Sequence, residues 1–487
     1  MSSTEEYKIV DFNKWFNEIV DKAELADLRY NIKGTIVYRP WCVSTMSKMF
    51  WIYENKLNET GHEQVIMPCL IPEENFKKEA EHVEGFTPNV FWVTEHGDEK
   101  FEERYALRPT SETAFYYMFK YWVQSYKDLP LKTYQRANIF RYETKATKPF
   151  FRAREFYWFE THNVFETLDE AKEQVLQDMQ ISEDILHDKF GIPFIFFKRP
   201  EWDKFPGAID TFAADTIMPN GKILQLPSTH LLGDKFTKAF DVKYKDKDGN
   251  YKYPMGTCYG PGISRIYGGL ISIHGDKKGL RLPFELAPIH IIILPLYFKE
   301  ADTNKIEELC VDLAEDLEKL GYVTRIDNDK EKTPKERFDF WEMKGVPIRL
   351  EVGPKDLENH TLTIFRRDLN TKEVVPLDDA FKKIKEISQE FTINLKAQAD
   401  KEFEKRIVSV TKYEDLKTAL DDGMLIRIPL CSTEMDGKEC ADKLKADTDG
   451  ADVRGERMDI EDLPGEDDVC VVCGKKAKAI VYIGRSY

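Results

Sequence analysis

The sequence predicts a mixed α/β (α+β) protein that is divided into about three domains. Its length is the first observation, because 487 residues exceed what one hydrophobic core normally organises. The second is an alternation of strand-like and helix-like segments between residues 288 and 385, which is typical of a compact α/β domain. The third is a group of four cysteines within the last sixty residues, which indicates a further small unit.

The N-terminal part contains two helical patterns followed by a short apolar run. Residues 12–29 repeat apolar side chains at helical spacing and predict an amphipathic helix. A second helix is predicted from 42 to 59, with Gly61 at the position of a C-terminal cap. The segment QVIMPCLIP then predicts a strand that ends, or lies at a sheet edge, because Pro68 interrupts it.

A hairpin is predicted between residues 132 and 166, where aromatic and β-branched residues surround basic ones. We expect a strand, a loop and a returning strand there. Thr167 and Glu170 then form the pattern of a capping box, which predicts that a helix begins at this point and continues to Gly191.

The C-terminal half begins with PIHIIILPL at 288–296, a continuous apolar run of the kind found in strands that are covered on both faces. Leucines and isoleucines from 306 to 320 mark one face of a helix that ends at Gly321. VPIRLEVGP, from Val346, predicts another strand. A long polar helix at 378–406 leads into the cysteine-bearing region.

Charge is distributed unevenly along the chain. The net charge of −16 argues against a surface that binds nucleic acid everywhere, because a polyanion needs basic partners. The segment 132–154, however, contains seven basic residues and one acid. An acidic protein with one focused basic segment can still bind tRNA there.

The sequence predicts a cytoplasmic protein without membrane contact. No segment approaches the roughly 18–20 uncharged apolar residues of a membrane-spanning helix. The N-terminus lacks the basic-then-apolar order of a signal peptide. A reducing compartment disfavours disulfides, so clustered cysteines there more often hold a metal.

The strongest chemical signal is RYETKATKPFFRAREFYWFETHNVF, from Arg141 to Phe165. Arg141 and Glu143 are expected on one face of an extended chain, and alternate residues of the return strand, from Phe156 to His162, on another single face. Such a face joins aromatic rings to an acid and an imidazole, and the arginines can hold phosphates through their planar forks. Taken alone, the segment is also compatible with a solvated basic hairpin.

Three segments in order establish a resemblance. GTIVYRPW through VIMPCLIP, the hairpin above, and GTCYGPGISRIYGGLISIHGDKKGLRLPFELAP resemble motifs 1, 2 and 3 of class II aminoacyl-tRNA synthetases. Four further segments are most similar to prolyl-tRNA synthetases of the archaeal and eukaryotic type: LRPTSET, FRAREFYW, WEMKGVPIRLEVGPKD and the terminal GRSY. The similarity extends from about residue 10 to the C-terminus.

The resemblance implies an architecture and an activity. It implies a catalytic domain built on an antiparallel sheet at 1–287, an α/β anticodon-binding domain at 288–385, and a small α+β zinc domain at 386–487. The implied activity is that of a proline–tRNA ligase, which joins proline to ATP as prolyl-adenylate, releases pyrophosphate, and transfers prolyl to the 3′ end of tRNA(Pro). The implied assembly is a homodimer, with Pro68 at its interface.

The same resemblance implies which residues bind the nucleotide. Arg141 and Arg265 would be catalytic: Arg141 would bind the α-phosphate together with the proline carboxylate, and Arg265 would hold the β/γ end with Arg152. Mg²⁺ would complete the neutralisation of the phosphates. The remaining implied ATP contacts are Phe156, stacked on adenine, with Glu143, Gln225 and Ser228 nearby.

The proline site is implied on the same grounds. Thr110 and Glu112 would receive the ammonium of proline, beside Arg141. The implied walls of the slot are Trp158, Glu160, His162 and His230. Each residue alone has an ordinary alternative: either histidine could be structural, Thr110 and Glu112 could begin a helix, and Arg265 could be a surface charge. The joint order of the residues favours the functional interpretation.

Two further sites are expected. Glu342, Arg349 and Lys355 would contact the guanines of a proline anticodon, because arginine and lysine read guanine acceptors and glutamate accepts from amino donors; ordinary surface charges are the alternative. Four cysteines have the pair-and-pair pattern of a structural tetrahedral zinc site, although free thiols remain possible: Cys431, Cys440, Cys470 and Cys473.

The spacing between the motifs carries a further expectation. Only about ninety residues separate Phe165 from Gly256, which leaves no room for the editing insertion of bacterial-type relatives. The competing interpretations are a non-catalytic paralogue and a synthetase for another amino acid. A paralogue of that kind would usually lose the motif arginines, which are all present here.

Overall fold

The computed structural model describes residues 11–82, 89–144, 146–297 and 303–487. The first ten residues of the expected catalytic domain and residues 298–302 of the expected anticodon domain therefore lie outside the description. No helix in the described ranges is long and apolar enough to cross a membrane. The helices and strands of all three regions confirm the predicted mixed α/β fold class.

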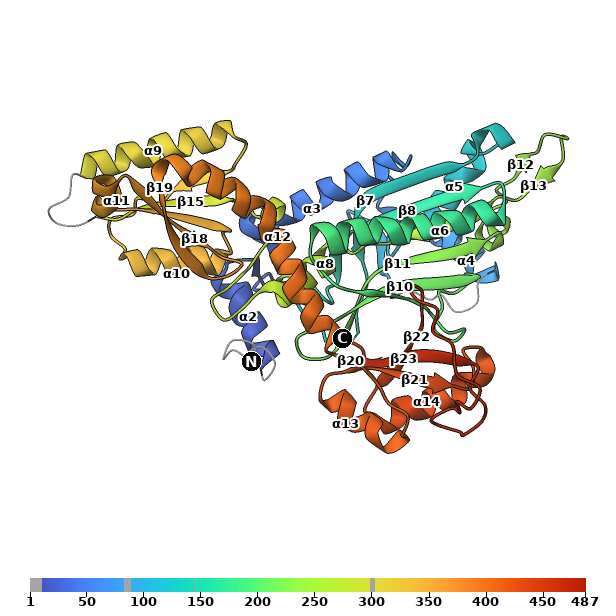
Figure 1. The fold of residues 1–487 in the computed structure, drawn as a ribbon. Coiled ribbons are helices and arrows are strands. Elements are labelled where there is room, and N and C mark those ends of the chain that lie inside the picture. The colour runs from blue at the N-terminus through green and yellow to red at the C-terminus, as the bar shows by residue number, and fades with distance from the viewer. Residues whose placement is uncertain (1–10, 83–88, 145, 298–302) are drawn as a thin grey trace.

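A long, mostly antiparallel sheet organises the first part of the chain (Figure 1). The hairpin of β7 (Leu131–Phe140) and β8 (Glu155–Phe165) is present as predicted. Outward from β8 follow four further strands, and β3 pairs parallel with β7 at the other edge: β14 (Met255–Tyr259), β11 (Ile223–Gly233), β10 (Asp210–Ile217), β9 (Ile195–Lys198) and β3 (Glu63–Gln64).

Three helices cover one face of this sheet and bury its apolar side chains. The helix α3 (Pro40–Glu59) was predicted, as was α6 (Leu168–Ser182) with its capping box of Thr167 and Glu170. The last predicted turns of α6, up to Lys189, wind as a π-helix. With α8 (Ile263–His274), they bury apolar residues in one continuous core.

Smaller elements frame the other end of the sheet. A three-stranded sheet, a two-stranded ladder and two short helices lie near α5 (Glu112–Trp122), which begins at a predicted site residue. These elements are β4 (Leu70–Pro72), β5 (Phe91–His96), β6 (Glu99–Leu107), α4 (Glu73–His82), α7 (Lys235–Ala239), β12 (Tyr244–Lys245), β13 (Tyr251–Lys252) and the 3₁₀ turn Tyr126–Asp128. The 3₁₀ turn Phe284–Leu286 lies against α3 instead.

Two of the predicted N-terminal elements are wrong in their extent. The helix expected at 12–29 ends earlier, as α2 (Phe12–Lys22), because Glu24 adopts a φ of 56° and the chain turns into a short ladder of β1 (Ala26–Asp27) with β2 (Val37–Tyr38). The run QVIMPCLIP contributes only its ends to strands β3 and β4, and its proline lies in the gap between them.

Residues from 291 to 376 form the predicted α/β unit, whose five strands have the order β16-β15-β17-β18-β19. Its first three strands are parallel and the last two antiparallel. The elements are β15 (Ile291–Pro295), α9 (Thr303–Lys319), β16 (Thr324–Ile326), α10 (Pro334–Lys344), β17 (Ile348–Val352), α11 (Pro354–Asn359), β18 (Thr361–Arg366), β19 (Thr371–Pro376) and the turn Leu377–Asp379.

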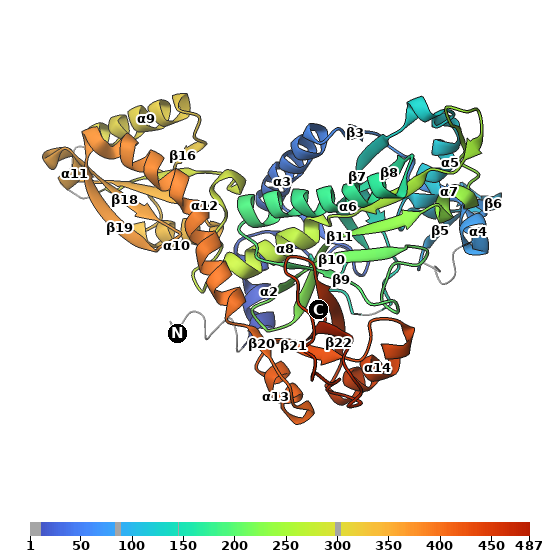
Figure 2. The ribbon, with the colours of Figure 1, turned by 45° about the vertical axis from the view of Figure 1, so that its right-hand side comes forward.

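The predicted long helix is α12 (Ala380–Glu404), which runs from this unit past the catalytic sheet to the C-terminal region (Figure 2). Its Asp400 accepts a hydrogen bond from His187, 2.9 Å away, which joins the helix to the end of α6. Residue 385, the expected end of the anticodon domain, lies inside this helix.

The C-terminal strands continue the catalytic sheet, because β22 pairs with β9 through Glu456–Lys198 and Arg457–Phe197. The sheet therefore has eleven strands. The elements of this region are β20 (Ile407–Ser409), α13 (Leu416–Asp421), β21 (Leu425–Leu430), α14 (Lys438–Asp447), β22 (Ala451–Arg457), β23 (Ala479–Arg485) and the turns Tyr413–Asp415 and Met435–Gly437.

Candidate active site

One cavity of about 570 Å³ opens at the face of the β7–β8 hairpin. Because side chains alternate along β8, four of its residues face this cavity together: Phe156, Trp158, Glu160 and His162. The predicted alternation is thus present. All thirteen side chains expected for ATP and proline line the cavity, the other nine being Thr110, Glu112, Arg141, Glu143, Arg152, Gln225, Ser228, His230 and Arg265.

The expected geometry of the loop after β7 is wrong in one respect. Arg141 and Glu143 do not lie on an extended strand, because β7 ends at Phe140 and the amide of Glu143 donates to the Arg141 carbonyl at 2.8 Å. The chain turns tightly there, and both side chains nevertheless line the cavity. The turn is stabilised by the amide of Arg141, which donates to the carbonyl of Arg154 at 3.0 Å.

Glu160 forms the fixed polar floor of the cavity. Its carboxylate accepts hydrogen bonds from the Ser111 amide (3.1 Å) and hydroxyl (2.5 Å) and from the Gln135 amide group (2.6 Å), and lies 3.1 Å from His162 Nε2. Burial raises the pKa of Glu160, but these hydrogen bonds outweigh it, so that the pKa lies below its ordinary value. Glu160 is therefore an ionised, immobile acceptor.

Glu112 is a second buried carboxylate with no cationic partner among the described residues. It begins α5, is 5% exposed, and accepts a hydrogen bond of 2.5 Å from the Thr110 hydroxyl. The residue begins a helix, as one interpretation made from the sequence expected, and it also lines the cavity. A buried carboxylate without a cation is a favourable site for a ligand ammonium.

Two polar groups of the cavity wall have unmet hydrogen-bonding capacity, whereas a third, His230, is fully bonded. Trp158 Nε1 and His162 Nδ1 are buried and have no partner among the described residues. The ring of His230 is held at both nitrogens, by the Thr211 and Ser228 hydroxyls, each at 3.0 Å. Burial, with the charges of Arg199 and His162, lowers the pKa of His230 to about 3, so that this wall is neutral.

Three arginines reach the cavity, and none of them is paired with an Asp or Glu side chain among the described residues. Arg141 donates to the Pro109 carbonyl at 2.9 Å, and Arg265 donates to the Phe151 carbonyl at 3.2 Å. Arg152 donates to the main-chain oxygen of Tyr487, the last residue, at 3.2 Å. Burial, together with the charges of Arg141 and Arg152, lowers the pKa of Arg265 to about 10. Uncompensated guanidinium groups at this density favour a polyanionic ligand.

Several residues of the site were missed from the sequence. Ser111 and Gln135 hold Glu160, yet Gln135 is recognisable only after the hairpin register places it opposite Glu160. Arg199 lines the cavity and forms a buried ion pair with Asp215 at 2.8 Å. No local sequence signal marks these roles, since each partner is distant along the chain.

The four C-terminal cysteines meet as predicted, with their sulfur atoms within 4.8 Å of one another. The Cys431 and Cys440 sulfurs are 3.6 Å apart. A tetrahedral ion with Zn–S bonds of ~2.3 Å requires sulfurs about 3.8 Å apart, so the donor set fits zinc.

The three expected anticodon residues lie in different environments. Arg349 is 3% exposed, is paired with Glu342 (2.8 Å) and Glu351 (3.0 Å), and lies 4.1 Å from the rings of both Phe338 and Phe365. Lys355 is exposed at the start of α11. The arginine is thus rigid and the lysine free to move.

Comparisons with known proteins agree with this fold. Residues 91–274 match the family described as the tRNA synthetase class II core domain (G, H, P, S and T), and residues 290–387 match an anticodon-binding domain. The chain belongs to the class II aminoacyl-tRNA synthetases.

The C-terminal region and the full-length relatives narrow this class. Residues 413–487 match the C-terminal domain of prolyl-tRNA synthetases. A proline–tRNA ligase of Thermofilum pendens is 49% identical over 99% of this chain and 98% of its own, and one of Methanopyrus kandleri is 39% identical over 98% and 96%. The chain is a member of the prolyl-tRNA synthetase family, the proline–tRNA ligases.

Solved structures support the same assignment. A Giardia lamblia prolyl-tRNA synthetase in complex with prolyl-adenylate has a TM-score of 0.94 at 36% identity, covering 100% of this chain and 99% of its own. A Cryptosporidium parvum prolyl-tRNA synthetase complexed with halofuginone and AMPPNP has a TM-score of 0.93 at 32% identity, covering 99% and 98%.

Proposed function

We propose that this chain activates proline with ATP and transfers the prolyl group to tRNA(Pro), with the residues of the 570 Å³ cavity in defined roles. The observation that carries the proposal is the meeting of three arginines and one carboxylate, Glu112, around an aromatic slot; within the described residues none of the four is paired with an oppositely charged side chain. This combination suits a triphosphate at one end and a cationic amine at the other.

The nucleotide would be held mainly by charge. Arg141 would bind the α-phosphate and the carboxylate that attacks it, while Arg152 and Arg265 would hold the β/γ end. Mg²⁺ would add positive charge to the phosphates. Phe156 would stack on adenine, next to the polar groups of Glu143, Gln225 and Ser228.

Proline would occupy the neighbouring slot. Its ammonium would bind Glu112 and Thr110, and its ring would lie between Trp158 and His230 above Glu160 and His162. The orphan nitrogens of Trp158 and His162 support a polar ligand in this place. The neutral state of His230 supports an apolar ring beside it.

The reaction would need no protein nucleophile. A carboxylate oxygen of proline forms a bond to the α-phosphorus, and the bond to the bridging oxygen of the β-phosphate breaks. Arg141 would stabilise the charge that develops between them, since preorganised donors in a dry site act most strongly on the transition state. The ribose hydroxyl of the tRNA then bonds to the carbonyl carbon of the prolyl group, the bond from that carbon to the phosphate oxygen breaks, and AMP leaves while the hydroxyl proton passes to solvent.

The other regions would serve recognition and assembly. We propose that Glu342, Arg349 and Lys355 read the anticodon guanines, and that four cysteines hold a structural zinc ion that leaves no position open for catalysis. The proposed domains are 1–287, 288–385 and 386–487. The four zinc ligands remain thiolates in a reducing cytoplasm, the location that we propose.

We also propose a homodimer in which α3 and the segment after it form the interface. Large apolar side chains are exposed there, including Ile66 (87%) and Trp51 (64%), and the others are Val43 and Leu70. Clustered exposed apolar residues indicate an interaction surface. Pro68 lies within the same segment.

The test is ATP–pyrophosphate exchange, screened across the standard amino acids. We expect exchange with proline, and a loss of at least about a hundredfold in Arg141→Ala, because the group at the α-phosphate is removed. Arg136→Ala is the matched control, since Arg136 lies on the same hairpin, is exposed, and is 3.8 Å from Glu54 on α3. Exchange with a different amino acid and none with proline would contradict the proposal.

A further inference from the structure

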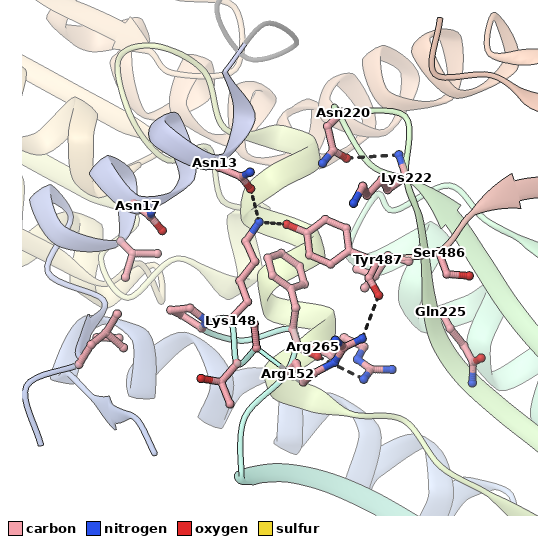
Figure 3. Close-up of a pocket in the computed structure, with 18 of the residues that line it drawn as sticks. Asn13, Asn17, Lys148, Arg152, Asn220, Lys222, Gln225, Arg265, Ser486 and Tyr487 are labelled. Atoms are coloured by element: carbon pink, nitrogen blue, oxygen red, sulfur yellow. Dashed lines mark hydrogen bonds between the residues drawn. The ribbon is translucent and has the colours of Figure 1, made fainter. Parts of the chain in front are cut away.

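A second, larger cavity of about 1160 Å³ adjoins the proposed nucleotide site (Figure 3). The two cavities share four lining residues: Phe151, Arg152, Gln225 and Arg265. The arginines proposed for the β- and γ-phosphates therefore lie at the junction of the two spaces. The second cavity extends away from the proline slot, since no residue of that slot lines it.

Its walls come from distant parts of the chain. Four of these parts carry the groups that matter here: α2 with Asn13, the loop with Lys148, the turn before β11 with Lys222, and the last residue, Tyr487. Figure 3 shows the Lys148 ammonium directed toward the Tyr487 hydroxyl, above Arg152 and Arg265. These side chains are far apart in the sequence, so folding alone brings them to one cavity.

The cations of this cavity fall into two sets. Three are neutralised by carboxylates: Arg29 by Asp27, Arg39 by Glu24, and Arg454 by Asp215. Four are paired with no Asp or Glu side chain in the part of the chain that the structure describes: Lys148, Arg152, Lys222 and Arg265. Of these, Arg152 donates to the main-chain oxygen of Tyr487 at 3.2 Å. A cavity whose cations outnumber its neighbouring carboxylates favours an anion of several charges.

Two side chains hold the ammonium group of Lys148 in position. Its ammonium donates a hydrogen bond of 2.6 Å to the Asn13 side chain and bonds the Tyr487 hydroxyl, and it lies 4.5 Å from the Tyr487 ring. Burial and the charge of Lys222 lower the pKa of Lys148 to about 8. A bound anion would offset both effects.

We infer that this second cavity is a pyrophosphate site, in which Lys148 and Lys222 receive the leaving group from Arg152 and Arg265. The inference rests on the proposed function, because the leaving group is the product of adenylate formation. As the bond to the α-phosphorus breaks, the electron pair stays on the bridging oxygen, and pyrophosphate carries away the charge of the β/γ end. Cations on the far side of the arginines then stabilise the separated product.

The experiment is proline-dependent exchange measured against pyrophosphate concentration in full-length protein. We expect Lys222→Ala and Lys148→Ala to raise the KM for pyrophosphate at least fivefold, with smaller changes in the KM for ATP and proline. Lys148→Arg should recover most of the affinity, because it keeps the charge. Lys382→Ala, an exposed lysine on α12, is the control and should behave as the wild type.

The outcomes separate this inference from the proposed function. Wild-type protein without proline-dependent exchange contradicts the proposed function. Normal exchange with an unchanged KM for pyrophosphate in Lys222→Ala overturns the second site. Lys222 is exposed and contributes to no core, so this variant stays informative even if Lys148→Ala fails to fold.

Discussion

Two buried carboxylates of the cavity, Glu160 and Glu112, differ in how completely they are hydrogen-bonded, and this difference suits them to different roles. Glu160 has four hydrogen-bonding groups around its carboxylate and is fixed. Glu112 is also buried, but within the described residues its carboxylate has a side-chain hydrogen bond from Thr110 alone. The first is suited to shaping the cavity and the second to binding a charged ligand. Burying a charged carboxylate without a partner costs free energy, because the surroundings have a low dielectric constant. A cationic ligand that pairs with Glu112 would remove this cost.

A buried histidine outside the site gives a prediction for pH. His62 is 3% exposed, and burial with the charge of Lys132 lowers its pKa to about 3. The unfolded chain binds this proton near pH 6.5, so stability is lost as the pH falls below that value. At pH 5 the contribution amounts to about 2 kcal/mol relative to pH 8.

We therefore expect His62→Gln to reduce the fall of the free energy of unfolding between pH 8 and pH 5. Denaturant unfolding of variant and wild type at both pH values measures this difference. His96→Gln is the control, because His96 is exposed on β5. Equal pH dependence in His62→Gln and wild type would show that the residue is not buried as a neutral ring.

At the scale of elements, the junction of β22 with β9 joins the C-terminal region to the catalytic sheet. A buried cluster fastens it: Asp215 of β10 accepts two hydrogen bonds from Arg199 and two from Arg454 of β22, at 2.8–3.0 Å. Arg454 also donates to the Ser486 hydroxyl at 2.8 Å. The cluster therefore connects the proposed ATP site to the end of the chain.

Replacing the acid of this cluster should destabilise the protein strongly. Asp215→Asn leaves two buried guanidinium groups without their counter-ion, at a cost of about 3–5 kcal/mol. Burial raises the pKa of Asp215, but the two arginines lower it to about 2, so this stabilisation is present above about pH 4 and is lost as the pH falls toward 2.

Thermal unfolding is the measurement for this junction, and Asp210→Asn on the same strand is its control. Asp210 pairs with Lys198 at 2.8 Å while both side chains are partly exposed, so its loss should cost less than about 1 kcal/mol. Similar shifts for the two variants would refute a special role for the buried cluster.

At the scale of the whole molecule, the catalytic cavity, the cysteine cluster and the anticodon unit are joined by one sheet and one long helix. The eleven-stranded sheet carries the catalytic face and the cysteine site, and α12 connects both to the anticodon unit. The C-terminal end also reaches the neighbourhood of the catalytic cavity, because β23 leads to Ser486 and Tyr487, which line the adjoining second cavity. Tyr487 accepts a hydrogen bond from Arg152, which lines both cavities.

Loss of zinc should consequently reduce adenylate formation although the metal is remote from it. Cys470→Ser, or exposure to a chelator, should lower the zinc content below one ion per chain, increase hydrogen exchange in residues 413–487, and diminish pyrophosphate exchange. Cys69→Ser, outside the cluster, should leave zinc unchanged. Full pyrophosphate-exchange activity in zinc-free protein would show that adenylate formation does not depend on the cysteine site.

The anticodon unit should affect only the second half-reaction. Arg349→Ala should raise the KM for tRNA in charging about tenfold or more, as expected for a lost contact to guanine, and preserve proline-dependent pyrophosphate exchange. Because Arg349 is buried, Lys355→Ala serves as a second variant at an exposed position. Lys319→Ala at the end of α9 is the control; normal charging by both test variants would exclude this anticodon site.

By itself the sequence determined the family, the mixed α/β class, the β7–β8 hairpin and the four-cysteine cluster. These features depend on local order: alternation along a strand, capping residues, and close spacing of ligands. The early end of α2, the tight turn after β7 and the joining of β22 to β9 were decided only by tertiary structure. So were the partners Ser111, Gln135, Asp215 and Tyr487, since contacts between distant segments follow from strand register and packing, which no local pattern records.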